Sequence, residues 1–325
     1  MDLSLPEESQ AFADVVADWA RRSLGDKPQA WHHGAALDEL GVFQLLGPDA
    51  LDPDHQHLTV SLVLERLAAA GMTGPLAETV WALAHDEGAD VADGWVGAPL
   101  DVTADGRALV PYGRRVARVL DASSPTRARP VDDLAPASLP MSEDGAWLPA
   151  DHGTALQDLD PAFAWTAYAS LTLGWCERLI DLALLQTRDR QAFGTSLLTF
   201  QAPRFTLVEA YQLVSGLRPA VRDVAWRLDR GLPGATAFAA SAWVLAADVG
   251  RRVATDVHQV MGAASFPRET GVTPVTGAMA VLRLGNGVDA AVETLWRTWR
   301  SVAPDRPTSI GGVLSADTEP AHRAS

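Results

Sequence analysis

Apolar residues recur every three or four positions through the first third of the chain, the spacing that places them on one face of an α-helix. The first run comprises Phe12, Val15, Val16 and Trp19. A second run covers residues 60–67 and stops before Gly71, a residue that favours a helix end, and a third covers residues 75–85. This pattern predicts an N-terminal helical domain over residues 1–88.

The helical spacing stops at about residue 89, and turn-forming residues divide the next stretch into short pieces. These residues are Pro99, Gly106, Pro111, Gly113, Pro125, Pro130, Pro136, Pro140 and Gly145. The runs left between them, at residues 108–110, 115–120 and 146–148, are short and largely apolar, as strands bounded by turns are. We therefore predict a small β domain over residues 89–158.

Helical periodicity returns after residue 159 in four long segments, at residues 161–187, 200–230, 236–262 and 275–300. Each segment carries a wide apolar stripe, as helices packed side by side do. The stripes predict a C-terminal four-helix bundle over residues 159–302, followed by a loose polar tail over residues 303–325. The predicted fold class is mainly α.

Composition and charge exclude several classes of protein. The 325 residues carry a formal net charge of −15, with a sequence pI of about 4.8, so the surface repels phosphate backbones and nucleic-acid binding is not expected. The single cysteine, Cys176, lies in an apolar helical pattern and is expected to be a core thiol of a cytoplasmic protein. The acidic N-terminus differs from a secretory signal, and no apolar run is long enough to cross a membrane.

Motifs for metal binding and for several common enzymes are missing. His32, His33, His55 and His57 lack a third ligand at a suitable spacing, so no metal site is predicted. The chain also has neither a glycine-rich dinucleotide or phosphate loop nor a serine nucleophile elbow.

The most specific stretch runs Arg188-Asp189-Arg190-Gln191-Ala192-Phe193-Gly194 and is followed by Phe200-Gln201. A guanidinium at a helix end, such as that of Arg190, can bind a pyrophosphate because its planar fork of donors matches phosphate oxygens. Gly194 permits a tight turn, and Gln201 can hydrogen-bond a polar cofactor edge. The alternative is an exposed arginine at a helix end with no ligand.

This stretch resembles the Arg-x-x-Phe-Gly and Phe-Gln signature of the acyl-CoA dehydrogenases. Gly174, residues 37–41 and residues 64–67 also resemble that family, so the resemblance covers nearly the whole chain and is poor only in the middle. It implies an acyl-CoA dehydrogenase-like fold, with an N-terminal helical domain, a small reduced β domain and a C-terminal four-helix bundle. It also implies FAD as the cofactor and an acyl-CoA thioester as the substrate.

The resemblance assigns cofactor-binding roles to particular residues. In the family, the positions of Arg190, Phe193 and Gln201 reach across a subunit interface to the FAD of the neighbouring subunit. A second segment, which begins at Gln259 and includes Gly262, is similar to the family's Gln-x-x-Gly-Gly-x-Gly sequence. Gln259 is either a flavin contact or an ordinary helix-end residue.

That second segment departs from the family pattern at two positions. Ala263 and Ser265 stand where the family has its second and third glycines. We expect a Cβ atom at either position to limit positive φ and close backbone approach. The family's Thr-Glu-Pro and Gly-Ser segments, which hold the flavin ring, also have no counterpart in the predicted β domain.

The group that should perform the chemistry is missing as well. The family's reaction removes a proton α to the thioester carbonyl, which requires a carboxylate base. The two positions that carry this glutamate in the family are Asn286 and Ala164 here, and neither side chain accepts a proton at neutral pH. No catalytic residue is therefore predicted, although Asp158, Asp160 and Glu293 remain as alternative bases.

Three hypotheses about function follow. The chain resembles the shorter, base-lacking subunit of heteromeric bacterial acyl-CoA dehydrogenases of the steroid side-chain type, which would pair with a glutamate-bearing homologous subunit. It could instead form a homomeric dimer or tetramer with altered chemistry in secondary metabolism. The third hypothesis is a flavin-free structural homologue.

Overall fold

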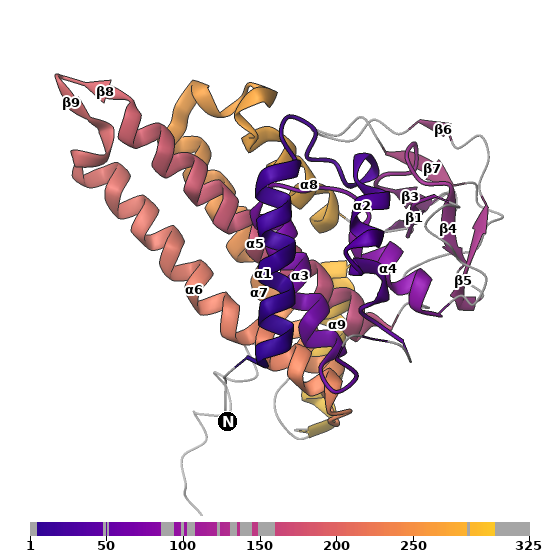
Figure 1. The fold of residues 1–325 in the computed structure, drawn as a ribbon. Coiled ribbons are helices and arrows are strands. Elements are labelled where there is room, and N and C mark those ends of the chain that lie inside the picture. Colours follow the sequence, from indigo (N-terminus) through magenta and orange to yellow (C-terminus); the bar gives the residue numbers. More distant parts are fainter. Residues whose placement is uncertain are drawn as a thin grey trace, which may run out of the picture.

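Helices form most of the molecule, and a region of short strands lies at one side of it (Figure 1). The computed structural model describes residues 5–47, 50, 52–85, 94–98, 101–102, 108–121, 124–130, 135–136, 145–148, 160–284 and 287–302. Along the chain the order is helices, strands and helices again, as the pattern of apolar positions predicts. The fold class is therefore mainly α.

The α-helices of the N-terminal part are α1 (Glu7–Ser23), α2 (Gly34–Glu39), α3 (Gln56–Ala69) and α4 (Leu76–His85). Glu7 and Glu8 lie in the first turn of α1 and Arg21 and Arg22 in its last turn, which is the distribution that the helix dipole favours. α3 is buried on nearly all sides because it packs against α1 on one side and against the helices of the C-terminal part on the other.

The strands that follow are short and pair into small sheets. In one sheet β1 (Val96–Gly97) is parallel to β4 (Arg118–Asp121), which pairs with β5 (Ser124–Pro130). The other is antiparallel, in the order β2 (Asp101–Val102), β3 (Ala108–Val110), β7 (Ala146–Leu148) and β6 (Ala135–Pro136). The strand predicted at residues 115–120 begins later, at Arg118, because residues 111–115 form a turn in which Gly113 N donates to Val110 O at 3.1 Å.

Aromatic and polar contacts attach the strands to the N-terminal helices. The ring of Trp95, just before β1, lies 5.7 Å from the ring of Phe43 in an edge-on arrangement. Val96 N donates to Thr79 Oγ1 on α4 at 3.2 Å. The strands are thereby fixed against the end of the molecule that contains α2 and α4 (Figure 1).

The helices of the C-terminal part are α5 (Pro161–Asp189), α6 (Gln201–Asp229), α7 (Ala235–Met261), α8 (Val272–Leu284) and α9 (Gly287–Val302). α5, α6 and α7 pack against one another, as the bundle prediction requires. The single segment predicted at residues 275–300 is divided into α8 and α9. Residues 285 and 286, between these two helices, lie outside the described residues.

α3 and α5 cross at unusually close range around Gly174. A Cβ atom at Gly174 would lie 2.1 Å from the backbone oxygen of Glu65, so no other residue fits there without moving a helix. Ser61 and Ser170 hydrogen-bond across the same interface at 2.8 Å. The close crossing places α3 in direct contact with the centre of the bundle.

A buried ion network joins α3 to α5 and α6. The carboxylate of Glu65 is fully buried, and Arg222 Nη2 lies 2.5 Å from its Oε2. Arg218 pairs both with Glu65, at 3.7 Å, and with Glu177. The contacts to Glu65 are ion pairs rather than well-aligned hydrogen bonds. Burial and the charge of Glu65 raise the pKa of Glu177.

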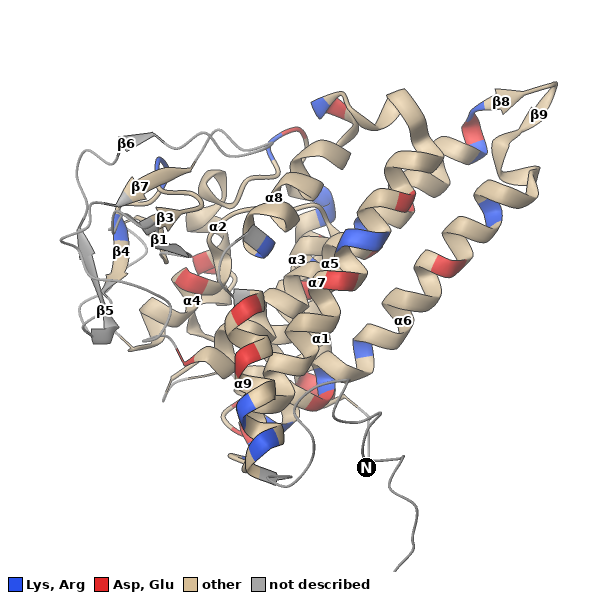
Figure 2. Ribbon diagram, turned by 180° about the vertical axis from the view of Figure 1, so that it is seen from behind, with Lys and Arg blue, Asp and Glu red and all other residues tan. Residues whose placement is uncertain are grey.

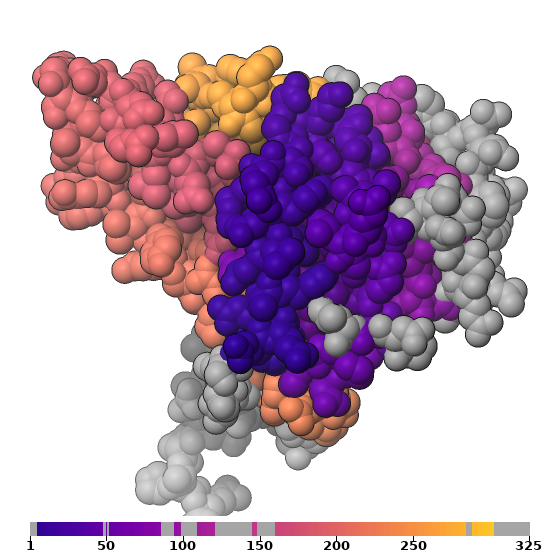
Figure 3. Space-filling model, viewed as in Figure 1, coloured from indigo at the N-terminus to yellow at the C-terminus, as the bar shows by residue number. Residues whose placement is uncertain are grey.

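Acidic and basic side chains are mixed over the surface. Acidic positions lie near the start of α9 and basic positions near its end, as the helix dipole favours (Figure 2). In the space-filling view the N-terminal helices cover the middle of one face, and the end of the molecule formed by α5 and α6 projects beside them (Figure 3). Within the described ranges, no helix combines the length and apolarity needed to cross a membrane.

Candidate functional site

Residues 190–194 lie in a tight hairpin that connects α5 to α6. β8 (Gln191–Ala192) pairs with β9 (Thr195–Ser196) in antiparallel register. The turn residues Phe193 and Gly194 have φ angles of +53° and +80°, the left-handed pair of a type I′ turn. Figure 1 shows this hairpin at the extremity of the molecule, on the opposite side from strands β1–β7.

Phe193 occupies this turn at an energetic cost. A left-handed backbone costs a residue with a side chain about 1–2 kcal/mol, and asparagine or glycine is normally found at this position. The Phe193 side chain is 99% exposed and its nearest aromatic neighbour is Phe200, with ring centroids 6.3 Å apart. Apart from this edge-on contact, the described part of the chain offers nothing that would offset the strained backbone and the exposed apolar ring.

Arg190 ties the hairpin to the end of α7. It is the C-terminal cap of α5, and its Nη1 donates to the backbone oxygen of Met261 at 3.4 Å. Its other guanidinium donors make no ion pair or hydrogen bond to any part of the chain that the structure describes. Arg190 is also exposed, so these donors are available to an anionic ligand.

The turn after α7 is built around Gly262. This residue has φ +59° and ψ −138°, a conformation open mainly to glycine, and a Cβ atom there would meet nothing within 4 Å. Ala263 and Ser265 lie in the 3-10 turn that follows, Gly262–Ser265. Among the described residues Phe193 is the only non-glycine residue with positive φ, so the expected conflict at Ala263 and Ser265 does not arise.

The side chain of Ser265 closes this turn. Its Oγ donates to Gly262 O at 2.7 Å and accepts from His258 Nδ1, also at 2.7 Å. Burial lowers the pKa of His258, which favours the neutral ring, and in that ring Nδ1 must carry the proton donated to Ser265. The exposed ring of Phe266 lies beside His258, with centroids 5.5 Å apart. Side-chain hydrogen bonds therefore hold this turn although Ala263 and Ser265 stand at two family glycine positions.

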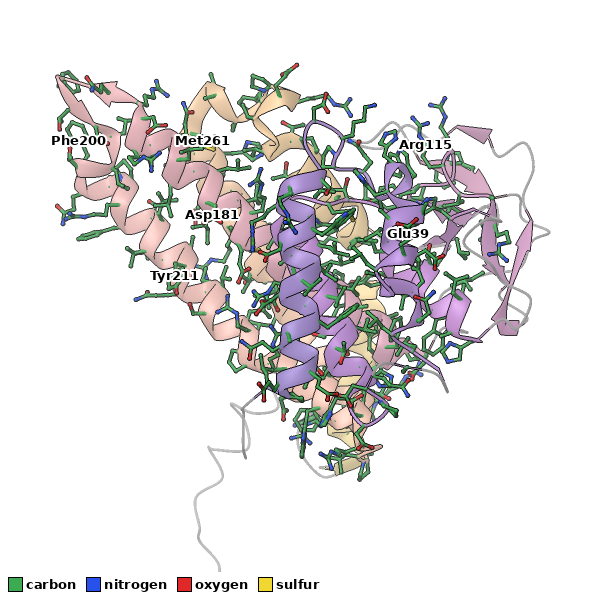
Figure 4. The ribbon with its side chains drawn as sticks, viewed as in Figure 1. Glu39, Arg115, Asp181, Phe200, Tyr211 and Met261 are labelled. Atoms are coloured by element: carbon green, nitrogen blue, oxygen red, sulfur yellow. The ribbon has the colours of Figure 1, made fainter. Side chains whose placement is uncertain are left out.

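The two predicted glutamines are exposed near these turns. Gln201 is the first residue of α6, whose N-cap residue Phe200 makes no side-chain cap, so the first backbone N–H groups of α6 remain suited to an anion. Gln259 lies in the last turn of α7. Figure 4 shows Phe200 and Met261 at the same end of the bundle. The structure thus brings both motif segments to one end of the molecule.

The expected positions of the base hold no free carboxylate among the described residues. Ala164 is buried in the first turn of α5. Asp160 Oδ1 caps α5 by accepting from Ala162 N at 2.9 Å, and exposed Glu293 accepts from Arg297 at 2.8 Å. Asp158 and Asn286 lie outside the described residues.

A buried carboxyl group that we did not predict lies beside this part of α5. Tyr168 follows Ala164 by one helical turn, and its Oη donates to Glu78 Oε1 on α4 at 3.0 Å. Glu78 is 6% exposed, and its burial raises its pKa from 4.5 to about 7. The sequence offered no reason to select Glu78, since a glutamate in the first turn of a helix is usually solvated.

The remaining candidates are part of the framework. His57 donates from its backbone and pairs through its ring with Asp229, at 2.7 and 3.0 Å, and so ties the start of α3 to the end of α6. Cys176 is fully buried, and burial raises the pKa of its thiol. Within the described part of the chain, no group of three or more His, Cys, Asp or Glu residues could hold a metal ion.

Residues 164–295, which include most of α5 to α9 and both turns, match the family model for the acyl-CoA dehydrogenase C-terminal domain. Residues 164–295 are thus similar to the C-terminal domain of acyl-CoA dehydrogenases. Over 113 residues the chain is 34% identical to the probable acyl-CoA dehydrogenase FadE25 of Mycobacterium tuberculosis, a match that covers 35% of this chain and 28% of FadE25. Over 104 residues it is 30% identical to cyclohex-1-ene-1-carbonyl-CoA dehydrogenase of Geobacter metallireducens, covering 32% and 27% of the two chains. The matches thus span less than a third of these relatives.

Solved structures extend the likeness to the whole chain. The ChsE4-ChsE5 complex from Mycobacterium tuberculosis contains a chain with a TM-score of 0.70 and 20% identity, covering 95% of this chain and 100% of that one. Butyryl-CoA dehydrogenase from Megasphaera elsdenii gives a TM-score of 0.64 and 16% identity, covering 92% and 100%. The acyl-CoA dehydrogenase fold therefore includes the strand region, where the sequence resemblance is poor.

Proposed function

We propose that this chain is a subunit of an FAD-dependent acyl-CoA dehydrogenase and that it completes the FAD site of a homologous, glutamate-bearing partner subunit. The observation that carries the proposal is the exposed, strained ring of Phe193, in a hairpin that Arg190 ties to the turn of Gly262. A fully exposed aromatic at such a turn is explained by a neighbour that covers it.

The residues at this end of the bundle suit a dinucleotide. The free donors of Arg190 and the uncapped start of α6 favour a pyrophosphate, and the open space at Gly262 allows a ligand to approach the backbone. Gln201 and Gln259 would offer amide groups to its polar edges. FAD, when bound, supplies the hydride acceptor for oxidation of a Cα–Cβ bond. The residues of this chain would position the cofactor and exclude water from it.

The proton acceptor would come from the partner subunit. The family's two base positions carry Asn286 and Ala164 in this chain, and neither can accept the α-proton. A solved neighbour that is itself a complex, ChsE4-ChsE5, supports an assembly of two related chains. The expected substrate is an acyl-CoA thioester, and the resemblance to the steroid side-chain dehydrogenases suggests its acyl group.

Co-expression with a glutamate-bearing homologue tests the proposal. We expect the chain alone to be colourless, and the purified complex to contain flavin and to oxidise acyl-CoA. Arg190→Ala should lower the flavin content of the complex about tenfold or more, because a charge-assisted contact to phosphate contributes about 1.5–3 kcal/mol. Arg188→Ala is the matched control, since Arg188 is exposed on the same segment and, among the described residues, pairs only with its neighbour Asp189.

The outcomes separate the three hypotheses. Strong dehydrogenase activity from the purified single chain would contradict a base-lacking subunit. A homodimer with stoichiometric flavin but no partner would favour the homomeric enzyme. If Arg190→Ala leaves flavin content and assembly unchanged in every complex, the cofactor role fails and the flavin-free homologue remains.

A further inference from the structure

A cavity of about 250 Å³ lies between α7 and α8, with α5 behind it. Its floor is made of small or flexible apolar residues, Ala247, Gly250 and Ala254 on α7 and Met279 on α8. Gly250 is the point of closest approach, because a Cβ atom there would lie 2.7 Å from Met279 Cε and 2.8 Å from Thr172 Cγ2. None of the cofactor residues proposed above lines this cavity.

The pairing of the two helices fixes which residues share each end of the cavity. His258 Nε2 lies 3.4 Å from Thr276 Oγ1, and Gly250 faces Met279. α8 therefore runs antiparallel to α7 along the cavity. Arg283, one turn beyond Met279, must lie toward the Trp243 end of α7.

Two side chains at the Trp243 end of the cavity have hydrogen-bond donors without a partner among the described residues. Arg283 is exposed and has no ion-pair or hydrogen-bond partner within the residues that the structure describes. The indole Nε1 of Trp243 is buried and also lacks a partner there, although Trp243 lines the cavity. A buried indole N–H normally finds an acceptor, so its isolation indicates a missing polar atom. Arg251 lies at the same cavity but is paired with Asp248 at 3.0 Å.

We infer that this cavity binds a small amphipathic carboxylate, with its anionic head at Arg283 and Trp243 and its apolar body along Ala247, Gly250 and Ala254. The chain has a net charge of −15, so an unpaired arginine at the mouth of an apolar cavity is a specific local attraction for an anion. A guanidinium matches a carboxylate by its planar donors, and the indole N–H can add one further hydrogen bond.

The size of the cavity limits the ligand. An engineered apolar cavity of about 150 Å³ accepts benzene, so a space of about 250 Å³ accepts a body somewhat larger than one aromatic ring. A medium-chain carboxylate such as octanoate fits this description, whereas a thioester that still carries coenzyme A does not. The inference is independent of the proposed dehydrogenase function.

Calorimetric titration of the full chain with three matched probes tests the assignment. Octanoate, 1-octanol and octylammonium share one apolar body and differ in the charge of the head. We expect saturable binding of one octanoate per chain, weaker binding of octanol by about tenfold, and still weaker binding of octylammonium. Octanol that binds as tightly as octanoate overturns the anionic head, and a lack of saturable octanoate binding overturns the site.

Variants locate the binding in this cavity. Ala254→Leu fills the floor and Arg283→Gln removes the cation, and each should weaken octanoate binding about tenfold, while Trp243→Phe should weaken it about fivefold. Arg252→Gln and Ala290→Leu are the controls, because both residues are exposed and neither lines the cavity. Equal losses in the Arg252→Gln control indicate general charge attraction and contradict the inference, as does normal binding by Ala254→Leu.

Discussion

Tyr168 Oη donates a hydrogen bond to Glu78 Oε1 at 3.0 Å, and both side chains are buried where α4 packs on α5. The pair joins the N-terminal helices to the bundle one turn from Ala164, a position at which some family members carry their base. Because little water reaches Glu78, the neutral carboxyl is favoured and its pKa rises to about 7. A proton is therefore held at this interface under conditions in which most glutamates are charged.

The Glu78 carboxyl should make the stability of the protein depend on pH. Its folded pKa of about 7 lies above its ordinary value of 4.5, so the folded state binds its proton more tightly than the unfolded state does. This contribution is complete below pH 4.5 and is lost as the pH rises toward 7, at up to about 1.4 kcal/mol per pH unit. Denaturant unfolding of the wild type and of Glu78→Gln, from pH 5 to pH 8, measures it as the difference between the two slopes.

A second variant at this interface tests the role of the tyrosine. The hydrogen bond from Tyr168 lowers the pKa of Glu78 and so opposes the effect of burial. Tyr168→Phe should therefore extend the pH-dependent loss of stability to higher pH without changing where it begins, whereas Glu78→Gln should abolish it. Identical pH profiles for the wild type and Glu78→Gln would show that Glu78 titrates normally.

Gly174 should be irreplaceable, although helix propensity alone favours alanine. Gly174→Ala places a Cβ atom 2.1 Å from the backbone oxygen of Glu65, so α3 and α5 must separate, and we expect a loss of about 3 kcal/mol or more in the free energy of unfolding. Gly216 lies in the middle of α6 with nothing within 4 Å of a Cβ atom. Gly216→Ala should raise the stability by about 0.5–1 kcal/mol. Urea unfolding of both variants tests the contrast, which disappears if the crossing at Gly174 is looser than described.

Arg222 should stabilise the folded protein mainly by pairing with the buried charge of Glu65. Arg222→Met removes the guanidinium 2.5 Å from a fully buried carboxylate, and we expect a loss of about 3 kcal/mol in the free energy of unfolding. The double variant Glu65→Met with Arg222→Met should recover most of that loss, because no unpaired charge remains. A double variant as unstable as the single one would mean that the packing of Arg222, rather than its charge, is what stabilises the interface.

The turn residue Phe193 should show a conflict between stability and assembly. Phe193→Asn keeps the type I′ turn and relieves left-handed strain, at the loss of only the long edge-on contact between the exposed ring and Phe200. We expect the free chain to become about 0.5–1 kcal/mol more stable by thermal unfolding. The same variant should weaken binding of the partner subunit in a native-mass titration. A loss of stability in the free chain would contradict this account of the turn.

Much of this protein could be predicted from local sequence. The 3.6-residue spacing of apolar positions placed α4 to α7 within one or two residues of their observed bounds, because a long helix must show one face to the core. The sequence from Arg190 to Gly194 likewise predicted a helix end followed by a tight turn, and the hairpin of β8 and β9 confirms it. The single helix predicted at residues 275–300 is two helices in the structure, α8 and α9, because a continuous apolar periodicity does not show where one helix ends and the next begins.

Other features of the protein depend on contacts between residues that are distant in sequence, so only the tertiary structure decides them. Glu78 is an ordinary first-turn glutamate until the tertiary fold buries it beside Tyr168, ninety positions later, and this burial raises its pKa. Ser265 looks like a lost glycine until its hydroxyl is seen to close the turn at Gly262. The cavity at Trp243 and Arg283 exists only because α8 packs on α7 at a face of small residues, and periodicity cannot distinguish a face that fits tightly from one that leaves a space.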